Sequence, residues 1–77
     1  MIDFKIYKTE YCPSCRVMEA KLKTMGLKGV AVNCSEKKEM QYLRKLLKKE
    51  NKEDFSSFPI IAWMKDGQID RLTSGVV

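Results

Sequence analysis

The chain has 77 residues, which is enough for one small domain and too few for two. Hydrophobic residues make up 44% of it and charged residues 32%, as in globular proteins, and no apolar run reaches the roughly 18 residues of a membrane-spanning helix. The formal charge is +5 and histidine is absent, which removes the commonest general base and metal ligand. We therefore expect a single globular domain over residues 1–77 whose chemistry, if any, depends on other side chains.

The first predicted element is a β-strand over residues 2–8. Ile2, Phe4 and Ile6 alternate with polar residues, and a period of two is typical of a strand with one buried face. The strand leads directly into a short loop that contains Cys12. This order of strand and loop places the cysteine at one edge of a sheet.

A helix is predicted to follow the loop and to end near Gly26. Pro13 suits the first helical position, where the N–H that proline lacks would be unpaired in any case. The apolar residues of this segment recur at helical spacing and are expected to form its buried face: Val17, Met18, Leu22 and Met25.

Two cysteines, Cys12 and Cys15, stand at the start of that helix. Unpaired backbone N–H groups and a partial positive charge at a helix start favour the thiolate form of Cys12. Cys15 lies almost one helical turn further on, so its thiol can attack a mixed disulfide formed on Cys12 and release the reduced substrate. The pattern predicts reversible dithiol–disulfide chemistry, in which nearby Lys8 and Arg16 add to the stabilisation of the thiolate.

Residues 29–34 are predicted to form a second strand, parallel to the first because a helix joins the two in a right-handed crossover. Ser35 is expected to cap a second helix, which ends before a polar loop over residues 51–57. Its basic residues mostly face water, and its buried stripe comprises Met40, Leu43, Leu46 and Leu47.

Pro59 precedes a third predicted strand over residues 60–64, which is apolar on both faces. Such a strand is normally covered by helices on both sides. Asp66 and Gly67 form a two-residue hairpin signal, and a fourth, antiparallel strand over residues 68–73 follows. The predicted fold class is therefore α/β, with the order β-α-β-α-β-β and a four-stranded mixed sheet between helices.

Three features together resemble the glutaredoxins and related small redoxins of the thioredoxin fold. They are Tyr11-Cys12-Pro13-Ser14-Cys15 after the first strand, Phe58-Pro59 before the third, and the Asp66-Gly67 hairpin with Gly75 beyond it. In that family the matching proline follows a cis peptide bond beside the dithiol, and the backbone of the preceding residue pairs with the incoming substrate. The resemblance implies Cys12 and Cys15 as catalytic residues. It also implies substrate contacts by Tyr11, Pro13, Ser14, Phe58 and Pro59.

The chain departs from the glutaredoxin pattern in ways that leave the electron donor open. Ser14 stands where an aromatic residue is usual, and residues 73–77 lack the Gly-Gly-x-Asp stretch of the glutathione site. The family's last helix also has no counterpart before the chain ends. We expect a thiol–disulfide oxidoreductase that reduces protein disulfides, with ribonucleotide reductase as one candidate substrate. No bound cofactor is expected, and the donor is either glutathione or a thioredoxin reductase.

Other readings of the same residues remain open at this stage. Cys12 and Cys15 would also suit half of a zinc or iron–sulfur site, although only Cys34 and carboxylates could complete four ligands. A non-catalytic adaptor of the same fold, or an iron–sulfur carrier, would keep the dithiol as well. Cys34 is expected to be a packing residue, with an extra redox-active thiol as its alternative. Trp63 and Tyr42 are expected to be packing groups.

The basic residues of segment 37–52 do not predict a nucleic-acid site. Glu36, Glu39 and Glu50 interrupt the run at spacings that suit helix ion pairs, and no aromatic residues are interleaved for base stacking. The positive charge is expected to steer the protein toward acidic partners. Residues 1–5 lack the pattern of a secretory signal, so we expect a monomer in the reducing cytoplasm that binds neither membranes nor nucleic acids.

Overall fold

A computed structural model describes residues 2–75 of the chain. Its elements follow the predicted order: β1 (Phe4–Lys8), α1 (Pro13–Thr24), β2 (Gly29–Asn33), α2 (Lys37–Lys49), β3 (Ile60–Lys65) and β4 (Gln68–Ser74). The strand boundaries differ slightly from the predicted ones. β1 begins at Phe4 rather than Ile2, β2 ends before Cys34, and β3 and β4 each extend one residue further. Val76 and Val77, part of the departure from the glutathione-site pattern, lie outside the described residues.

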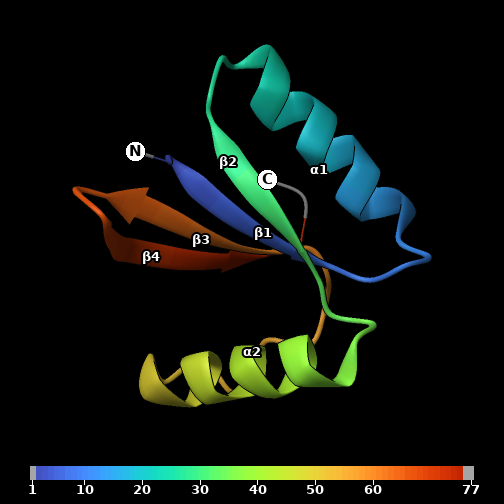
Figure 1. Ribbon diagram of the computed structural model, residues 1–77, viewed down its shortest axis with the longest axis vertical. Helices are drawn as coiled ribbons and strands as arrows, with labels where there is room; N and C mark the ends of the chain where they lie inside the picture. The colour runs from blue at the N-terminus through green and yellow to red at the C-terminus, as the bar shows by residue number, and fades with distance from the viewer. Residues whose placement is uncertain (1, 76–77) are drawn as a thin grey trace.

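The four strands form one mixed sheet in the order β2-β1-β3-β4. β1 and β2 are parallel, as predicted from the helix that joins them, and β3 pairs antiparallel with both β1 and β4. Figure 1 shows α1 on one side of the sheet and α2 on the other. The predicted fold class is confirmed.

The sheet face under α2 carries the larger apolar cluster. Leu43 and Leu47 of α2 are buried there, while Met40 and Leu46 pack at its margin, so the predicted stripe of this helix is correct. The strands contribute the other buried members: Tyr7, Ile60, Ala62 and Leu72, with Cys34 just beyond β2. Burial of this kind is the main stabilising contribution in a domain of this size.

The face under α1 carries a smaller cluster. Met18 and Leu22, four residues apart on one side of α1, pack against Phe4 and Ile6 of β1 and Ile61 of β3. Val17 and Met25 were predicted to join them, but each is 58% exposed. That prediction was wrong because α1 presents only one side to the sheet. Val17 is rotated about 100° from Met18 around the helix axis, and Met25 lies past the last helical residue.

Ser35 does not cap α2, contrary to the prediction. The N-cap is Glu36, which makes no side-chain cap hydrogen bond. The Ser35 hydroxyl instead accepts a hydrogen bond of 2.8 Å from the backbone N–H of Glu10, in the loop between β1 and α1. The Ser35 N–H donates to Asn33 Oδ1 at 3.0 Å. Ser35 therefore ties the end of β2 to the loop that carries Cys12.

Two expectations about α2 were also wrong, while the hairpin prediction was correct. Tyr42 was expected to pack, but it is 61% exposed because it faces away from the sheet. Among residues 2–75, the acidic residues expected to form ion pairs on α2 have no ion-pair partner, since long side chains on an exposed helix gain little by pairing. Asp66 and Gly67 have φ values of 54° and 78°, as their turn requires.

Candidate active site

Cys12 and Cys15 lie at the start of α1, just after the loop that follows β1. Cys12 is the N-cap residue of α1, and Pro13 occupies the first helical position as predicted. The two cysteines are joined by a disulfide, with their Cα atoms 5.2 Å apart. The expected pairing of these thiols is therefore confirmed.

The start of α1 places a backbone donor at the sulfur of Cys12. Cys12 Sγ accepts a hydrogen bond of 3.2 Å from the backbone N–H of Cys15. The first turn carries no acidic residue that would oppose a negative charge. N–H groups at a helix start stabilise a thiolate more than a thiol. A negative charge on Cys12 is therefore favoured when the disulfide is open.

The two cysteines differ in accessibility. Cys15 is 1% exposed, whereas Cys12 is partly exposed at the surface. A substrate can reach Cys12 directly, and Cys15 can react only with a sulfur already bound at that position. This asymmetry fits the predicted division into an attacking and a resolving cysteine.

Pro59 lies at the same edge of the sheet as the cysteine loop. Tyr7, near the end of β1, pairs with Ile60, the first residue of β3. The Phe58–Pro59 peptide bond is cis, as the resemblance implies. Pro59 is buried, and its carbonyl accepts a hydrogen bond of 2.8 Å from the N–H of Gly75.

The side chain of Phe58 is packed within the protein, whereas its backbone polar groups are unpaired within residues 2–75. The side chain packs against the apolar cluster under α2. Within the part of the chain that the structure describes, its backbone N–H and C=O have no hydrogen-bonding partner. Unpaired backbone groups at the same end of the sheet as the cysteine loop are suited to pairing with an extended substrate chain.

Two small hollows adjoin Cys12. One, of about 310 Å³, is lined by Glu10, Tyr11, Cys12, Pro13 and Arg16. The other, of about 220 Å³, is lined by Lys8, Thr9, Glu10, Cys12, Cys15, Arg16 and Asn33. Tyr11 and Pro13 line the first hollow together with Cys12, and Tyr11 is 90% exposed, while their contact with a substrate stays a prediction. Ser14 is exposed and lines neither hollow.

Sequence reasoning did not identify Asn33, Thr9 and Glu10 as neighbours of the dithiol. Asn33 comes to this place because Lys8 and Asn33 are partners at the carboxyl ends of β1 and β2. The rule that parallel strands end at a common edge could have found it. Glu10 and Thr9 belong to the same loop as Cys12, so their closeness follows from the short connection alone.

Cys34 lies in the apolar cluster under α2 and is 2% exposed. Burial, together with the nearby charge of Glu39, raises the pKa of this thiol from 9.0 to about 11. A thiol that stays protonated and is shielded from solvent is a poor nucleophile. The expectation of a packing residue is confirmed, and the alternative of an extra redox-active thiol has no support.

Neither a metal centre nor a membrane span emerges from residues 2–75. No group of three or more Cys, Asp or Glu side chains in that range is arranged to hold a metal ion. No helix there is both long and apolar enough to cross a membrane.

No protein-family model matches the chain, and no curated protein sequence matches it significantly. Among solved structures, a glutaredoxin from Archaeoglobus fulgidus is similar, with a TM-score of 0.70 and 16% identity over 100% of this chain and 78% of that one. A thioredoxin from Plasmodium falciparum is similar with a TM-score of 0.58 and 21% identity, over 99% of this chain and 74% of that one. The predicted resemblance is thus confirmed for the fold: this is a thioredoxin-fold chain with a Cys-x-x-Cys disulfide.

Proposed function

We propose that the protein is a dithiol–disulfide oxidoreductase that reduces disulfides in other proteins. One observation carries the proposal. Cys12 Sγ accepts a backbone hydrogen bond at the start of α1, while its disulfide partner Cys15 is 1% exposed. The first cysteine is thereby prepared for attack on a substrate, and the second is reserved for the step that releases the substrate.

The reaction proceeds through two exchanges. In the reduced protein, the Cys12 thiolate attacks one sulfur of a substrate disulfide, and the other substrate sulfur leaves as a thiolate and takes up a proton. Cys15 then loses its proton and attacks Sγ of Cys12, which expels the second substrate sulfur as a thiolate. Two electrons pass to the substrate, and the Cys12–Cys15 disulfide found in the structure is the oxidised product.

The groups around Cys12 suit an extended substrate segment. The backbone N–H and C=O of Phe58, which have no partner among residues 2–75, would pair with the residue beside the substrate cysteine. Tyr11 and Pro13 form an apolar surface next to the reactive sulfur, and Pro59 holds the Phe58 backbone at the sheet edge. Ser14, which lines neither hollow, would contact the substrate only on the exposed side of the motif.

The regeneration step requires an electron donor in the cytoplasm, and the two candidates are glutathione and a thioredoxin reductase. The similar folds of a glutaredoxin and a thioredoxin support both. Measuring how fast each system re-reduces the oxidised protein distinguishes them. Ribonucleotide reductase, as candidate substrate, is tested by supplying its oxidised form to the reduced protein and counting turnovers.

Cysteine variants test the assignment of roles. Cys12→Ser should abolish reduction of a protein disulfide such as that of insulin, with the fold retained. Cys15→Ser should instead trap a mixed disulfide on Cys12, detectable by mass spectrometry. Cys34→Ala is the matched control and should retain the wild-type rate, because Cys34 lies in the opposite core. A Cys12→Ser variant that keeps full activity would refute the proposal, and one that still binds its partner would favour an adaptor.

A further inference from the structure

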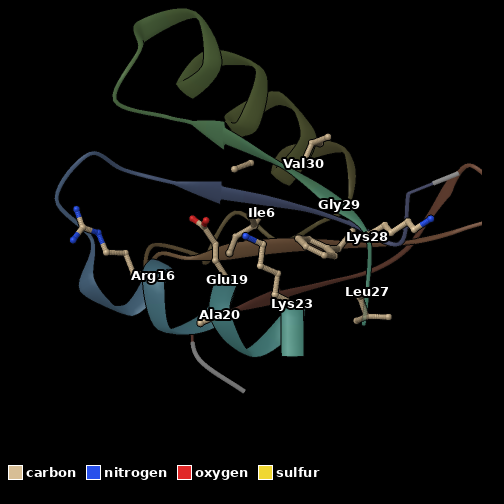
Figure 2. Close-up of a pocket in the computed structure, with 11 residues that line it drawn as sticks. Ile6, Arg16, Glu19, Ala20, Lys23, Leu27, Lys28, Gly29 and Val30 are labelled. Atoms are coloured by element: carbon tan, nitrogen blue, oxygen red, sulfur yellow. The ribbon is translucent and has the colours of Figure 1, made fainter. Parts of the chain in front are cut away.

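A larger groove lies between α1 and the β2 side of the sheet. Its volume is about 600 Å³, and it is open to solvent along its length. The floor and the strand side comprise Phe4, Ile6, Leu27, Lys28, Gly29, Val30 and Ala31. On the opposite side, Figure 2 shows Glu19 and Lys23 pointing from α1 toward the strands. The groove therefore combines an apolar floor with charged walls.

Gly29 keeps the floor of this groove open. A Cβ atom at that position would lie 2.5 Å from the Phe4 carbonyl oxygen and 2.6 Å from its ring. Any side chain there would displace the Phe4 ring, which is 8% exposed and belongs to the cluster under α1. The shape of the groove thus depends on a residue with no side chain.

The walls of the groove carry an excess of positive charge. Arg16, Lys23 and Lys28 line it, and within residues 2–75 none of them has a carboxylate at ion-pair distance. Glu19 is the acidic residue of the lining, but its Oε1 atom is buried and lies 3.1 Å from Lys8 Nζ. The nearby Asp3 carboxylate accepts the backbone N–H of Lys28, at 2.9 Å. Glu19 Oε1 therefore approaches Lys8 without a hydrogen bond, Asp3 accepts one from the backbone, and neither carboxylate forms an ion pair with Arg16, Lys23 or Lys28 within residues 2–75.

The groove is continuous with the surface around the dithiol. Arg16 lines the groove and also both hollows that adjoin Cys12. A polypeptide that crosses Cys12 can therefore extend past Arg16 and along α1 toward Lys23. Such a segment would meet apolar surface below it and unpaired cations beside it.

We propose that this groove binds an acidic, partly apolar segment of the protein whose disulfide is reduced at Cys12. The inference rests on the proposed function for the identity of the partner, and on charge complementarity and continuity with Cys12 for the place of binding. Apolar side chains of the segment contact Phe4, Ile6 and Leu27, and its carboxylates approach Lys23 and Lys28.

A direct binding experiment tests the groove without any redox step. The probe is a cysteine-free peptide of alternating Glu and Leu, and its counterpart has Lys in place of Glu. With the oxidised protein, we expect the acidic peptide alone to shift the NMR signals of Lys23 and of the β2 amides. The double variant Lys23→Glu/Lys28→Glu should bind this peptide weaker by on the order of tenfold.

A matched control separates a local site from the overall charge. Lys38→Glu/Lys45→Glu makes the same change in net charge on α2, on the other side of the sheet, and should keep wild-type binding. Equal losses in the two double variants would overturn the proposal, as would peptide-induced shifts confined to residues outside the groove.

Kinetics then separate the failure of this inference from the failure of the proposed function. The two peptides are each joined to a short disulfide-bonded probe, and kcat/KM is measured with the reduced protein. We expect the acidic probe to be preferred by on the order of tenfold at low salt, and Lys23→Glu/Lys28→Glu to lose this preference. The same variant should reduce hydroxyethyl disulfide at the wild-type rate.

Equal kcat/KM values for the acidic and basic probes would overturn the proposed binding in the groove and leave the proposed oxidoreductase function unaffected. Binding of the acidic peptide in the groove by a protein that reduces none of the disulfides would support the groove as a binding site and overturn the proposed function.

Discussion

The sheet face under α2 buries Tyr7, Cys34, Leu43, Leu47, Ile60, Ala62 and Leu72 in one cluster, whereas the face under α1 buries only Phe4, Ile6, Met18, Leu22 and Ile61. The second face also keeps an open groove beside its cluster. The dithiol stands at the start of the helix on this less filled side. This difference shows that most of the stabilising apolar burial lies on the α2 side of the sheet. The reactive dithiol and the open groove lie on the α1 side.

Among the substitutions that test this difference between the two faces, Leu43→Ala is expected to cause the largest loss of stability. Leu43 is 1% exposed at the centre of the cluster under α2, and truncating a leucine at such a site costs about 3 kcal/mol of unfolding free energy. Urea denaturation of the oxidised protein measures it. The exposed neighbour Tyr42 supplies the control, because Tyr42→Ala should change stability by less than about 0.5 kcal/mol. Similar losses in both variants would contradict the assignment of this stability to the burial of Leu43 under α2.

The pH dependence of stability should come next in size and should involve Cys34. Its pKa is raised from 9.0 to about 11, so the folded state holds this proton more strongly than the unfolded chain. The resulting stabilisation is complete below pH 9 and is lost as the pH rises toward 11, by on the order of 2 kcal/mol.

Thermal unfolding of the oxidised protein at several pH values measures this effect as the difference between wild type and Cys34→Ala. Tyr7 is coupled to this titration, because its pKa is raised first by burial and then by the charges of Cys34 and Glu39, so the measured difference also contains the change that Cys34→Ala makes in the pKa of Tyr7. A constant difference across the alkaline range would contradict the assignment.

A smaller effect is expected on the face under α1, at the hydrogen bond between Trp63 Nε1 and Thr73 Oγ1, which measures 2.9 Å. Thr73→Val removes the acceptor and leaves a partly buried indole N–H without a partner, at a cost of about 1 kcal/mol. Thr24→Val is the matched control, because the Thr24 hydroxyl donates to Ala20 on an exposed helix surface. Denaturant unfolding should separate the two variants, and a larger loss from Thr24→Val would contradict this ranking.

The smallest effect is expected from Glu19→Gln, which breaks the ion pair with Lys8. Both side chains are 35% exposed although the Glu19 Oε1 atom itself is buried, so solvent screens the pair in part and its loss should cost about 0.5 kcal/mol. The difference from wild type should disappear in high salt. Asp70→Asn, at an exposed position of β4, is the control. A loss of several kcal/mol that persists in salt would mean that the face under α1 depends on this pair far more than on its apolar cluster.

The sequence was sufficient for the order of elements, the parallel pairing of β1 with β2, the β3–β4 hairpin and the disulfide, because each of these has a local signal, whereas the antiparallel pairing of β1 with β3 has none. Alternation identified β1, Pro13 and Gly26 bounded α1, and Asp66-Gly67 required a hairpin. The disulfide could also be predicted, because Cys12 and Cys15 are only three residues apart in the sequence.

The remaining features depend on how the elements sit against one another. Helical spacing alone could not tell that Val17 would be exposed while Met18 is buried, since both fit an apolar repeat. Nor could it assign Ser35 to Glu10, because that bond links two loops 25 residues apart. The groove along α1 is lined by residues of α1, β1 and β2 together, and the sequence holds no periodic signal for how these elements lie against one another.

The backbone N–H and C=O of Phe58, unpaired in the described part of the chain, have a consequence for substrate specificity. The backbone is chemically the same in every polypeptide, so a contact made through backbone hydrogen bonds accepts substrate segments of any sequence. Discrimination between substrate proteins would then have to come from surfaces further from Cys12. Substitutions on those surfaces could change the substrate preference without changing the disulfide exchange itself.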